Sequence, residues 1–148
     1  RQRRQELERA TVSFVHPGEA QAEREFNLQG EETSVFVEPT SGRRGRRGRK
    51  WFSFDVPVRR EDAGKPRTLV VTYHSDQPRA RTFEILVDGT RVGEQTLPPS
   101  GASRFVDVEY ALPAATLEGK QRVTVRFQAM QGREIAAVYG IRLVRAPR

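Results

Sequence analysis

The sequence predicts an all-β protein built as a β-sandwich, and two observations carry this prediction. From residue 51 onward, apolar residues recur at every second position, which is the pattern of half-buried strands rather than of helices. Turn-forming residues separate these short runs, and no long amphipathic helix lies between them. We therefore expect eight or nine strands around a single core, which suits a chain of 148 residues.

The predicted strands follow one another along the chain. The earliest two are short and lie in TVSFV, at residues 11–15, and in TSVFV, at residues 33–37. Each later strand has one apolar side to bury, formed by every second residue. In chain order, these sides are Phe52, Phe54, Val56 and Val58; Leu69, Val71 and Tyr73; Phe83, Ile85 and Val87; Val106, Val108 and Tyr110; Val123, Val125, Phe127 and Ala129; and Tyr139, Ile141 and Leu143.

Turn residues mark the connections between these strands. Asp88-Gly89 predicts a tight hairpin, because Asp and Gly both tolerate positive φ. Pro98-Pro99-Ser100-Gly101 ends the following strand. We assign residues 1–10 to a linker or short helical stub, since they are too few to form a stable helix alone, and residues 11–148 to a single β-sandwich domain.

Positive charge is concentrated in two segments. The formal net charge is +7; residues 1–9 carry a net +2, and the run from Arg43 to Lys50 adds +6, which leaves −1 for the rest of the chain. Arg-Gly runs can bind RNA, but one short run without a basic sheet face does not favour a nucleic-acid partner. Because like charges spaced by glycine repel one another, we expect residues 40–50 to form a mobile loop.

Several classes of function are not supported by the sequence. Without cysteine there are no disulfides, thiolate metal sites or cysteine nucleophiles, and the serines lack a G-x-S-x-G context. Asp107 and Glu109 alternate with valines on the solvent side of a strand, so no acid and carboxylate pair for glycoside hydrolysis is identified. No apolar run is long enough to span a membrane. No catalytic residue is therefore assigned.

The order of the strands predicts which loops meet in space. Successive antiparallel strands run up and down between the two ends of a sandwich. Counting them in this way places residues 38–50, 75–81, 98–103 and 130–136 at one rim. Binding residues are often carried by loops on a rigid scaffold, so we expect a ligand site at this rim.

Five residues are the candidates for that site. A sugar site commonly combines an aromatic face with polar groups that reach hydroxyls. Trp51 or Tyr73 would offer the face, and His74, Arg79 and Arg133 would reach the hydroxyls. Trp51 points away from Phe52, so it also fits a second hydrophobic layer or a contact with a neighbouring domain.

Several segments resemble a known family. HPGEAQAEREFNLQGEETSVF, WFSFDVPV, the strand pair around VDGT, FVDVEYALP and GKQRVTVRFQA are similar to the non-catalytic C-terminal β-sandwich of enzymes resembling glycoside hydrolase family 127, the β-L-arabinofuranosidase group. The resemblance runs from about Thr11 to Arg145. The order of strands also resembles carbohydrate-binding modules with a galactose-binding-like jelly roll.

This resemblance implies an accessory domain of a carbohydrate-active enzyme, without catalysis of its own. Two functions stay open: a carbohydrate-binding module, and a structural domain that packs on the catalytic domain or mediates dimerisation. The implied partners are the catalytic domain of a parent protein, a plant-type or bacterial glycan, or a second copy of the chain. A secreted or periplasmic location is favoured by the resemblance only.

No cofactor is expected, apart from a structural calcium ion such as related modules often carry. Glu19, Glu23 or Glu25 with backbone carbonyls would supply the oxygen ligands that calcium prefers. The last strand, VYGIRLV, lacks the acidic residue that such modules usually place there. His16 and His74 are the only histidines, which does not favour a transition-metal site.

Overall fold

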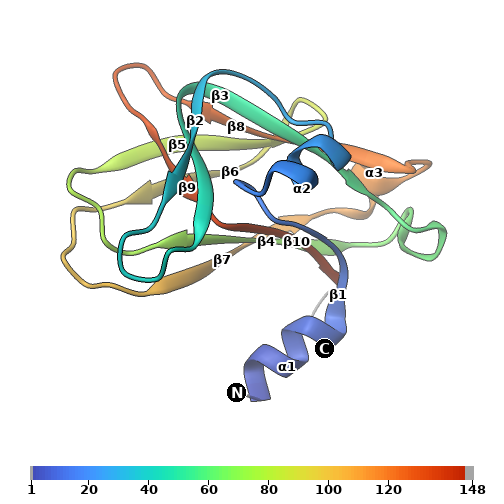
Figure 1. Ribbon diagram of the computed structural model, residues 1–148. Coiled ribbons are helices and arrows are strands. Elements are labelled where there is room, and N and C mark those ends of the chain that lie inside the picture. Colours follow the sequence, from blue (N-terminus) through green and yellow to red (C-terminus); the bar gives the residue numbers. More distant parts are fainter. Residues whose placement is uncertain (1, 146–148) are drawn as a thin grey trace.

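The strands of the protein form two antiparallel sheets packed face to face, in a computed structural model that describes residues 2–145 (Figure 1). In chain order, the elements are α1 (Gln2–Ala10), β1 (Thr11–Val15), α2 (Ala20–Glu25), β2 (Gln29–Val37), β3 (Arg44–Pro57), the 3-10 turn η1 (Arg60–Asp62), β4 (Arg67–His74), β5 (Arg81–Val87), β6 (Thr90–Leu97), β7 (Phe105–Leu112), α3 (Ala114–Leu117), β8 (Arg122–Ala129), β9 (Ile135–Val138) and β10 (Gly140–Arg145). None of the helices in this part of the chain is long and apolar enough to cross a membrane.

The smaller sheet has the order β1-β10-β4-β7, and the larger has the order β2-β3-β8-β5-β6, with β9 paired to β3. The last strand, β10, therefore lies inside its sheet, between β1 and β4. On one side of the sandwich β6 contacts β7, and on the other β1 contacts β3. The strands thus form the two facing sheets of a sandwich, and the prediction of an all-β sandwich is confirmed.

The core lies between the two sheets and contains the residues that the alternation predicted. All of the predicted apolar sides are buried except Val106, Val108 and Ala129, which pack against the core as partly buried residues. The rings of Phe52 and Phe127 stack across β3 and β8 with their centroids 5.1 Å apart. Each such buried side chain contributes about 1.5–3 kcal/mol through the hydrophobic effect.

Two buried tyrosines satisfy their polar ends within this core. The hydroxyls of Tyr73 and Tyr110 lie 2.7 Å apart, and Tyr110 donates to Oε1 of Gln95 at 2.8 Å. Since the one hydroxyl proton of Tyr110 goes to Gln95, Tyr73 donates to Tyr110. Burial raises the pKa of both phenols. A chain of this kind avoids the cost of leaving a hydroxyl unpaired away from water.

The predicted hairpin at Asp88-Gly89 is confirmed. These two residues join β5 to β6 with φ angles of +48° and +83°, as a tight turn with two left-handed residues requires. The carboxylate of Asp88 also accepts a hydrogen bond from the backbone N–H of Thr124 at 2.8 Å. The turn is therefore anchored to the neighbouring strand β8.

The prediction that residues 40–50 form a mobile loop is wrong. β3 begins at Arg44 and runs for 14 residues, so only residues 38–43 connect it to β2. Arg46 forms a buried ion pair with Glu23, and Lys50 lies 3.1 Å from Glu31. Partners from distant parts of the chain thus neutralise charges that, in the sequence alone, only repel one another.

The glycines of this arginine-rich strand have a packing role. A Cβ added to Gly45 would lie 2.8 Å from the carbonyl oxygen of Val138 and 2.8 Å from the ring of Tyr139. On the other side, a Cβ added to Gly18, whose φ is +91°, would lie 2.7 Å from the backbone nitrogen of Gly45. Gly45 therefore allows the backbone of β3 to lie close to Val138 and to Gly18. The glycines of the arginine-rich run reflect this close packing and do not indicate disorder.

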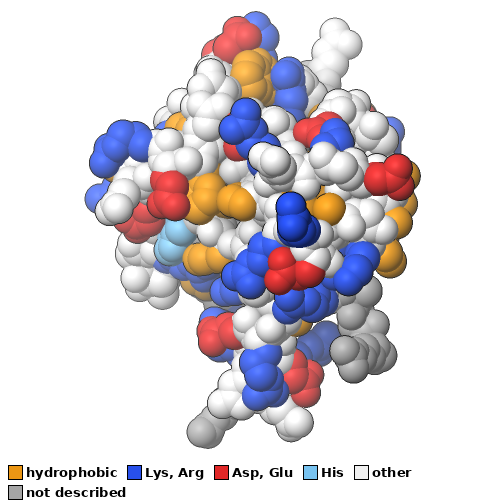
Figure 2. Space-filling model, turned by 90° about the vertical axis from the view of Figure 1, so that its right-hand side faces the viewer, with side chains coloured by type: hydrophobic (Ala, Val, Ile, Leu, Met, Phe, Trp, Pro, Cys, Tyr) orange, Lys and Arg blue, Asp and Glu red, His pale blue; other side chains and the backbone are white. Residues whose placement is uncertain are grey.

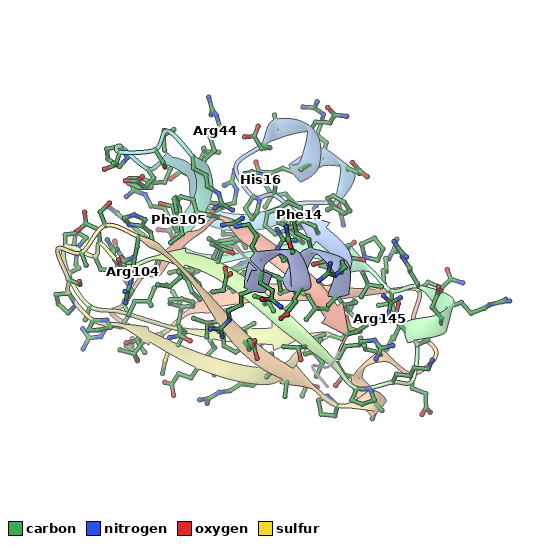
Figure 3. All side chains as sticks on the ribbon, turned by 90° about the horizontal axis from the view of Figure 1, so that it is seen from below. Phe14, His16, Arg44, Arg104, Phe105 and Arg145 are labelled. Atoms are coloured by element: carbon green, nitrogen blue, oxygen red, sulfur yellow. The ribbon has the colours of Figure 1, made fainter. Side chains whose placement is uncertain are left out.

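The outer face of the smaller sheet carries a cluster of aromatic and arginine side chains (Figure 3). The guanidinium of Arg43 lies 4.7 Å from the ring centre of Phe105, and that of Arg142 lies 4.3 Å from the ring centre of Phe14. Helix α1 lies over the same face in Figures 1 and 3 and has no buried residue. Cation–π contacts of this kind cover aromatic surface at the sheet edge.

Figure 2 shows the end of the molecule that lies at the right in Figure 1, where the connections at residues 57–66, 88–90 and 113–121 gather. Positive and negative side chains are intermixed over this end, and hydrophobic side chains appear in small separate patches. A ligand site is better sought at the other end, where the predicted rim lies.

Candidate ligand-binding site

The loops at the left-hand end of Figure 1 are linked to one another by direct contacts. Gln77 and Ser100 exchange two backbone hydrogen bonds of 3.1 Å each, which join the loop after β4 to the loop after β6. Arg81, at the beginning of β5, forms an ion pair with Glu134 from the loop before β9. Three of the four predicted rim segments therefore meet.

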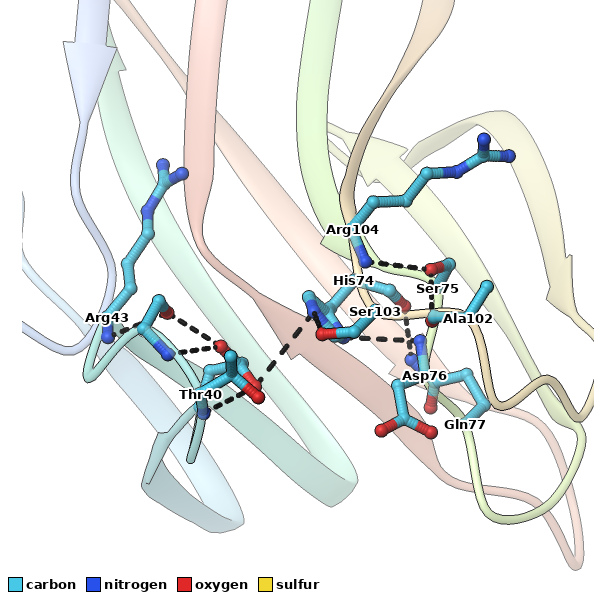
Figure 4. A network of polar contacts seen from close by, with 11 residues as sticks. Thr40, Arg43, His74, Ser75, Asp76, Gln77, Ala102, Ser103 and Arg104 are labelled. Carbon is cyan, nitrogen blue, oxygen red and sulfur yellow. Dashed lines mark hydrogen bonds and ion pairs between the residues drawn. The ribbon is translucent and has the colours of Figure 1, made fainter.

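Glu38, on the loop after β2, brings the fourth segment to this rim. Figure 4 shows a dashed line that joins the loop of Thr40 to His74. The carboxylate of Glu38 accepts hydrogen bonds from the hydroxyl of Ser41 at 2.7 Å and from the backbone N–H groups of Ser41 and Thr40 at 2.8 and 3.0 Å. These bonds lower the pKa of Glu38 to about 2, so the buried carboxylate is ionised at neutral pH. Its Oε2 lies 4.0 Å from Nε2 of His74, which confirms the predicted rim of four segments.

His74 occupies a fixed position in this network. Its Nδ1 accepts a hydrogen bond from the backbone N–H of Asp76 at 3.2 Å, so in the neutral ring Nε2 carries the proton. Glu38 and the hydroxyl of Ser103, 3.5 Å away, both face Nε2. A catalytic triad needs the serine and the carboxylate on opposite ring nitrogens. The ring therefore orders the loops and is not arranged to act as a general base toward Ser103.

Two adjoining depressions open at this rim, with volumes of about 430 and 300 Å³. They share Arg47, Arg81 and Ile135 in their lining. The larger lies between the β2–β3 ribbon and the segments that carry Arg79, Arg81 and Glu134. The smaller extends along Phe36, His74 and Tyr139. Because they share these residues, the two depressions adjoin. The larger has a mainly polar lining and the smaller a more apolar one, and both are of the size of a small-ligand site.

The larger depression is rich in arginine. The carboxylate of Glu134 pairs with Arg81, and it also lies 3.5 Å from Arg49 and 3.9 Å from Arg79. The side chain of Arg81 is 9% exposed, and burial lowers its pKa. Arg47 covers the ring of Phe36, with its guanidinium carbon 4.4 Å from the ring centre. Guanidinium donors therefore reach the depression from β3 and from the segment around Arg79 and Arg81.

Of the five predicted site residues, two lie in this surface. His74 lines the smaller depression and Arg79 lines the larger. Arg133 is exposed in the neighbouring turn, where its backbone N–H bonds to the carbonyl of Met130, and it lines neither depression. The role of His74, Arg79 and Arg133 in ligand binding stays a prediction.

The placement of Tyr73 at the surface is wrong. Its side chain is fully buried, because the alternation that puts Leu69 and Val71 in the core puts Tyr73 there as well. Its ring packs edge-on against Phe83, with centroids 5.6 Å apart, and its hydroxyl is paired with Tyr110. The ring is therefore not available as a face for a sugar.

Trp51 lies on the outer face of the larger sheet and not at the rim. Because β3 begins at Arg44, Trp51 falls in the middle of the strand, opposite Gln128 of β8. Arg126 lies 4.0 Å above its ring, and its indole N–H donates to Glu31 at 3.1 Å. The indole donor and one ring face are thus already occupied.

Sequence reasoning missed Arg47 and Glu38 as parts of this site. Both lie in or beside the segment that was expected to be mobile. Burial in this run does not alternate strictly, since Gly45, Arg46 and Gly48 are buried while Arg47 and Arg49 are exposed, so the sequence pattern alone does not identify Arg47.

The carboxylates proposed for calcium are differently engaged. Glu23 accepts two hydrogen bonds from Arg46, at 2.6 and 3.1 Å, and a third from the backbone N–H of Gly18 at 2.9 Å. Glu19 and Glu25 are exposed. Among residues 2–145, no group of three or more acidic or histidine side chains is arranged to hold a metal ion. A guanidinium thus occupies the position beside Glu23 where a cation would bind.

Two antiparallel sheets around one core, with the ligand-sized surface on the loops, place the chain in the class of jelly-roll β-sandwiches. The chain belongs to the family described as a family of unknown function (DUF6805), whose sequence profile matches residues 6–144. No curated protein matches the sequence at a significant level.

Solved structures with this fold include carbohydrate-binding modules. A family 35 module from Clostridium thermocellum has a TM-score of 0.61 and 12% identity, and the match covers 90% of this chain and 99% of that one. The CBM36-1 domain of a multidomain xylanase from the hindgut metagenome of Trinervitermes trinervoides has a TM-score of 0.59 and 11% identity, covering 91% and 98%. An exo-β-1,3-galactanase from Phanerochaete chrysosporium has a TM-score of 0.59 and 15% identity, but this chain covers 29% of that enzyme. At such identities the likeness concerns the fold alone.

Proposed function

We propose that the chain is a non-catalytic glycan-binding module and that the two rim depressions hold the sugar. One observation carries the proposal: side chains from separate segments line a continuous, ligand-sized surface at one end of a fold that carbohydrate-binding modules share. Contacts within the protein, among them those of Glu38 and His74, link those segments to one another. A preorganised site of this kind loses little entropy on binding.

The lining supplies the chemistry that sugar recognition needs. The guanidinium groups of Arg47 and Arg79 donate to hydroxyl oxygens, and the carboxylates of Asp76 and Glu134 accept from hydroxyl protons. Phe36, half-buried at the edge, provides an apolar contact for a ring. Each such hydrogen bond replaces one with water, so a single module binds weakly, in the micromolar to millimolar range.

The proposal extends to the role of the chain as an accessory domain of a carbohydrate-active enzyme similar to the β-L-arabinofuranosidase group. It is supported by the segments that resemble the C-terminal sandwich of such enzymes, and by the galactanase, in which a sandwich of this size makes up less than a third of the chain. The catalytic domain of that parent would be the covalent partner. Sequencing the adjoining coding region tests this, since an RNA-processing domain there would contradict it.

A second function is favoured by the exposed hydrophobic residues. Phe14 on β1 and Val35 and Val37 on β2 are large apolar side chains with 36% or more of their surface exposed. β1 and β2 are the edge strands on the same side of the sandwich. This side would suit packing on a catalytic domain or on a second copy of the chain. The domain would then be structural rather than glycan-binding.

Calorimetry with arabinan fragments, preceded by a glycan array, tests the two functions. We compare the unmodified chain with Arg79→Ala, which removes an exposed side chain of the larger depression, and with Trp51→Ala, which changes the outer face of the larger sheet. Circular dichroism verifies that each variant is folded. Binding that is lost in Arg79→Ala and kept in Trp51→Ala supports the rim site.

The other outcomes of these measurements contradict a glycan site at the rim. Binding lost only in Trp51→Ala would move the site to the outer face of the larger sheet. If no glycan binds at millimolar concentration, while light scattering shows a dimer that Phe14→Ser or Val37→Ser dissociates, the structural function replaces the glycan-binding one.

A further inference from the structure

The larger depression contains more positive charge than its own carboxylates offset. Four arginines line it, Arg47, Arg49, Arg79 and Arg81, against the two carboxylates of Glu32 and Glu134. Three of the four converge on Glu134 alone. In the described part of the chain, Glu32 forms no ion pair with any of them. One carboxylate thus serves three guanidinium groups.

Arg81 is the buried base of this cluster. Its side chain is 9% exposed, and its bond to Glu134 uses Nη1, while Nε is buried without a hydrogen-bond partner in the described residues. Burying a guanidinium that is only partly satisfied costs free energy, which a second anion near the cluster would offset. Burial also lowers the pKa of Arg81, in agreement with a charge that is short of partners.

Arg47, on β3, and Arg79, on the loop before β5, both line the larger depression. Arg47 is fixed against Phe36 and, within residues 2–145, forms no ion pair. Arg79 is 73% exposed and its distance to Glu134 is 3.9 Å, too long for a hydrogen bond. A group placed between them would meet two planar guanidiniums, each with parallel N–H donors.

We infer that the rim depression binds an acidic glycan, with the carboxylate of a uronic acid residue between Arg47 and Arg79. This inference rests on the proposed glycan-binding function and specifies its substrate class. Glu134 shows that the arginine cluster accepts a carboxylate, since it already holds one. The hydroxyls of a neutral sugar can also accept hydrogen bonds from these guanidiniums, but they do not neutralise the excess positive charge as a carboxylate does. Nucleic acid is less suited, because a run of phosphates needs a more extended basic surface, and outside its two basic segments the chain carries a net charge of −1.

The test compares matched acidic and neutral sugars on the folded chain. Calorimetry uses an oligogalacturonide, the same oligosaccharide after reduction of its carboxyl groups to alcohols, and a xylo-oligosaccharide bearing glucuronate. We expect carboxyl reduction to weaken binding by about tenfold or more, because a charge-assisted pair of hydrogen bonds is lost. Binding of the acidic probes should weaken as salt is raised, since these charges are solvent-accessible.

Substitutions of single arginines test which side chains bind the carboxylate of the acidic sugar. Arg47→Ala and Arg79→Ala should each weaken acidic-probe binding by about tenfold. Arg44→Ala is the matched control: it removes an exposed arginine from the same strand that does not line the depression, and it should leave binding unchanged. Thermal melting of each variant excludes loss of fold as the cause.

The remaining outcomes overturn the inference in distinguishable ways. Equal binding of the reduced and unreduced oligosaccharides, or binding of neutral arabinan fragments alone, removes the acidic specificity and leaves the glycan-binding function standing. Absence of binding to every acidic and neutral sugar removes both. Binding of a single-stranded oligonucleotide that depends on Arg47 and Arg79, with no sugar bound, would replace the glycan by nucleic acid.

Discussion

The guanidinium of Arg46 and the carboxylate of Glu23 form a two-point ion pair, with Nε 2.6 Å from Oε2 and Nη2 3.1 Å from Oε1. Their side chains are 10% and 9% exposed. The pair joins α2 to β3 across 23 positions of sequence. It links the arginine-rich first part of β3 to α2 and neutralises one of its charges.

Breaking this pair should destabilise the protein strongly. Arg46→Met leaves the Glu23 carboxylate buried and without its cation, and we expect the free energy of unfolding to fall by about 3–5 kcal/mol. Urea denaturation followed by tryptophan fluorescence measures the loss. Arg44→Ala, an exposed position two residues earlier, should change stability by less than about 0.5 kcal/mol. Equal effects of the two substitutions would show that the pair contributes no net stability.

Gly45→Ala should also destabilise the fold. The new Cβ would lie 2.8 Å from both the Val138 carbonyl and the Tyr139 ring, so β9 must move away from β3. We expect a cost of about 1–3 kcal/mol, as for other overpacked sites. Gly101→Ala is the matched control, because a Cβ there has no atom within 4 Å. An unchanged melting temperature for Gly45→Ala would mean that the two strands are less tightly apposed.

The low pKa of Glu38 predicts an acid-sensitive rim. Hydrogen bonds from Ser41 and Thr40 lower this pKa from 4.5 to about 2 in the folded protein. A lowered folded-state pKa stabilises the protein above the unfolded value, and this stabilisation is lost as the pH falls from about 4.5 to 2. Glu38→Gln should therefore lower the melting temperature at neutral pH and make it depend less on pH across that interval. Parallel pH curves for the two proteins would contradict this.

Calcium should not change the stability of the chain. Because Arg46 already neutralises Glu23, calcium would have to displace a guanidinium that makes two hydrogen bonds. We expect the same melting temperature in millimolar calcium and in a chelator. A calcium-dependent rise that the double substitution Glu19→Gln with Glu25→Gln removes would restore the calcium site that the sequence suggested.

The strands and the rim could be predicted because they depend on local information. Alternation placed Phe52, Phe54 and Phe127 in the core, and Asp88-Gly89 set a hairpin through its own backbone preferences. Successive antiparallel strands alternate in direction, and counting them placed the segments that carry Glu38 and His74 at the same end of the sandwich.

The composition of the site depends on pairings that local patterns do not contain. β3 extends back to Arg44 because it pairs with the preceding strand β2, and because Glu23 and β9, which are distant in sequence, supply further partners. That extension places Trp51 in mid-strand and Arg47 at the rim. Tyr73 is a different case, because the alternation already put it on the buried side with Leu69 and Val71; only the partner of its hydroxyl, Tyr110, 37 positions away, is missing from the local pattern.

The position of β10 between β1 and β4 constrains how the chain folds during synthesis. Of the described strands, β1 is synthesised first, yet its hydrogen-bonding partner, residues 141–144, belongs to the strand that is synthesised last. The first strand must therefore wait, unpaired, until nearly the whole domain has been translated. Pairing across so long a stretch of sequence is slow, so the smaller sheet should close last, after the hairpins of the larger one have formed.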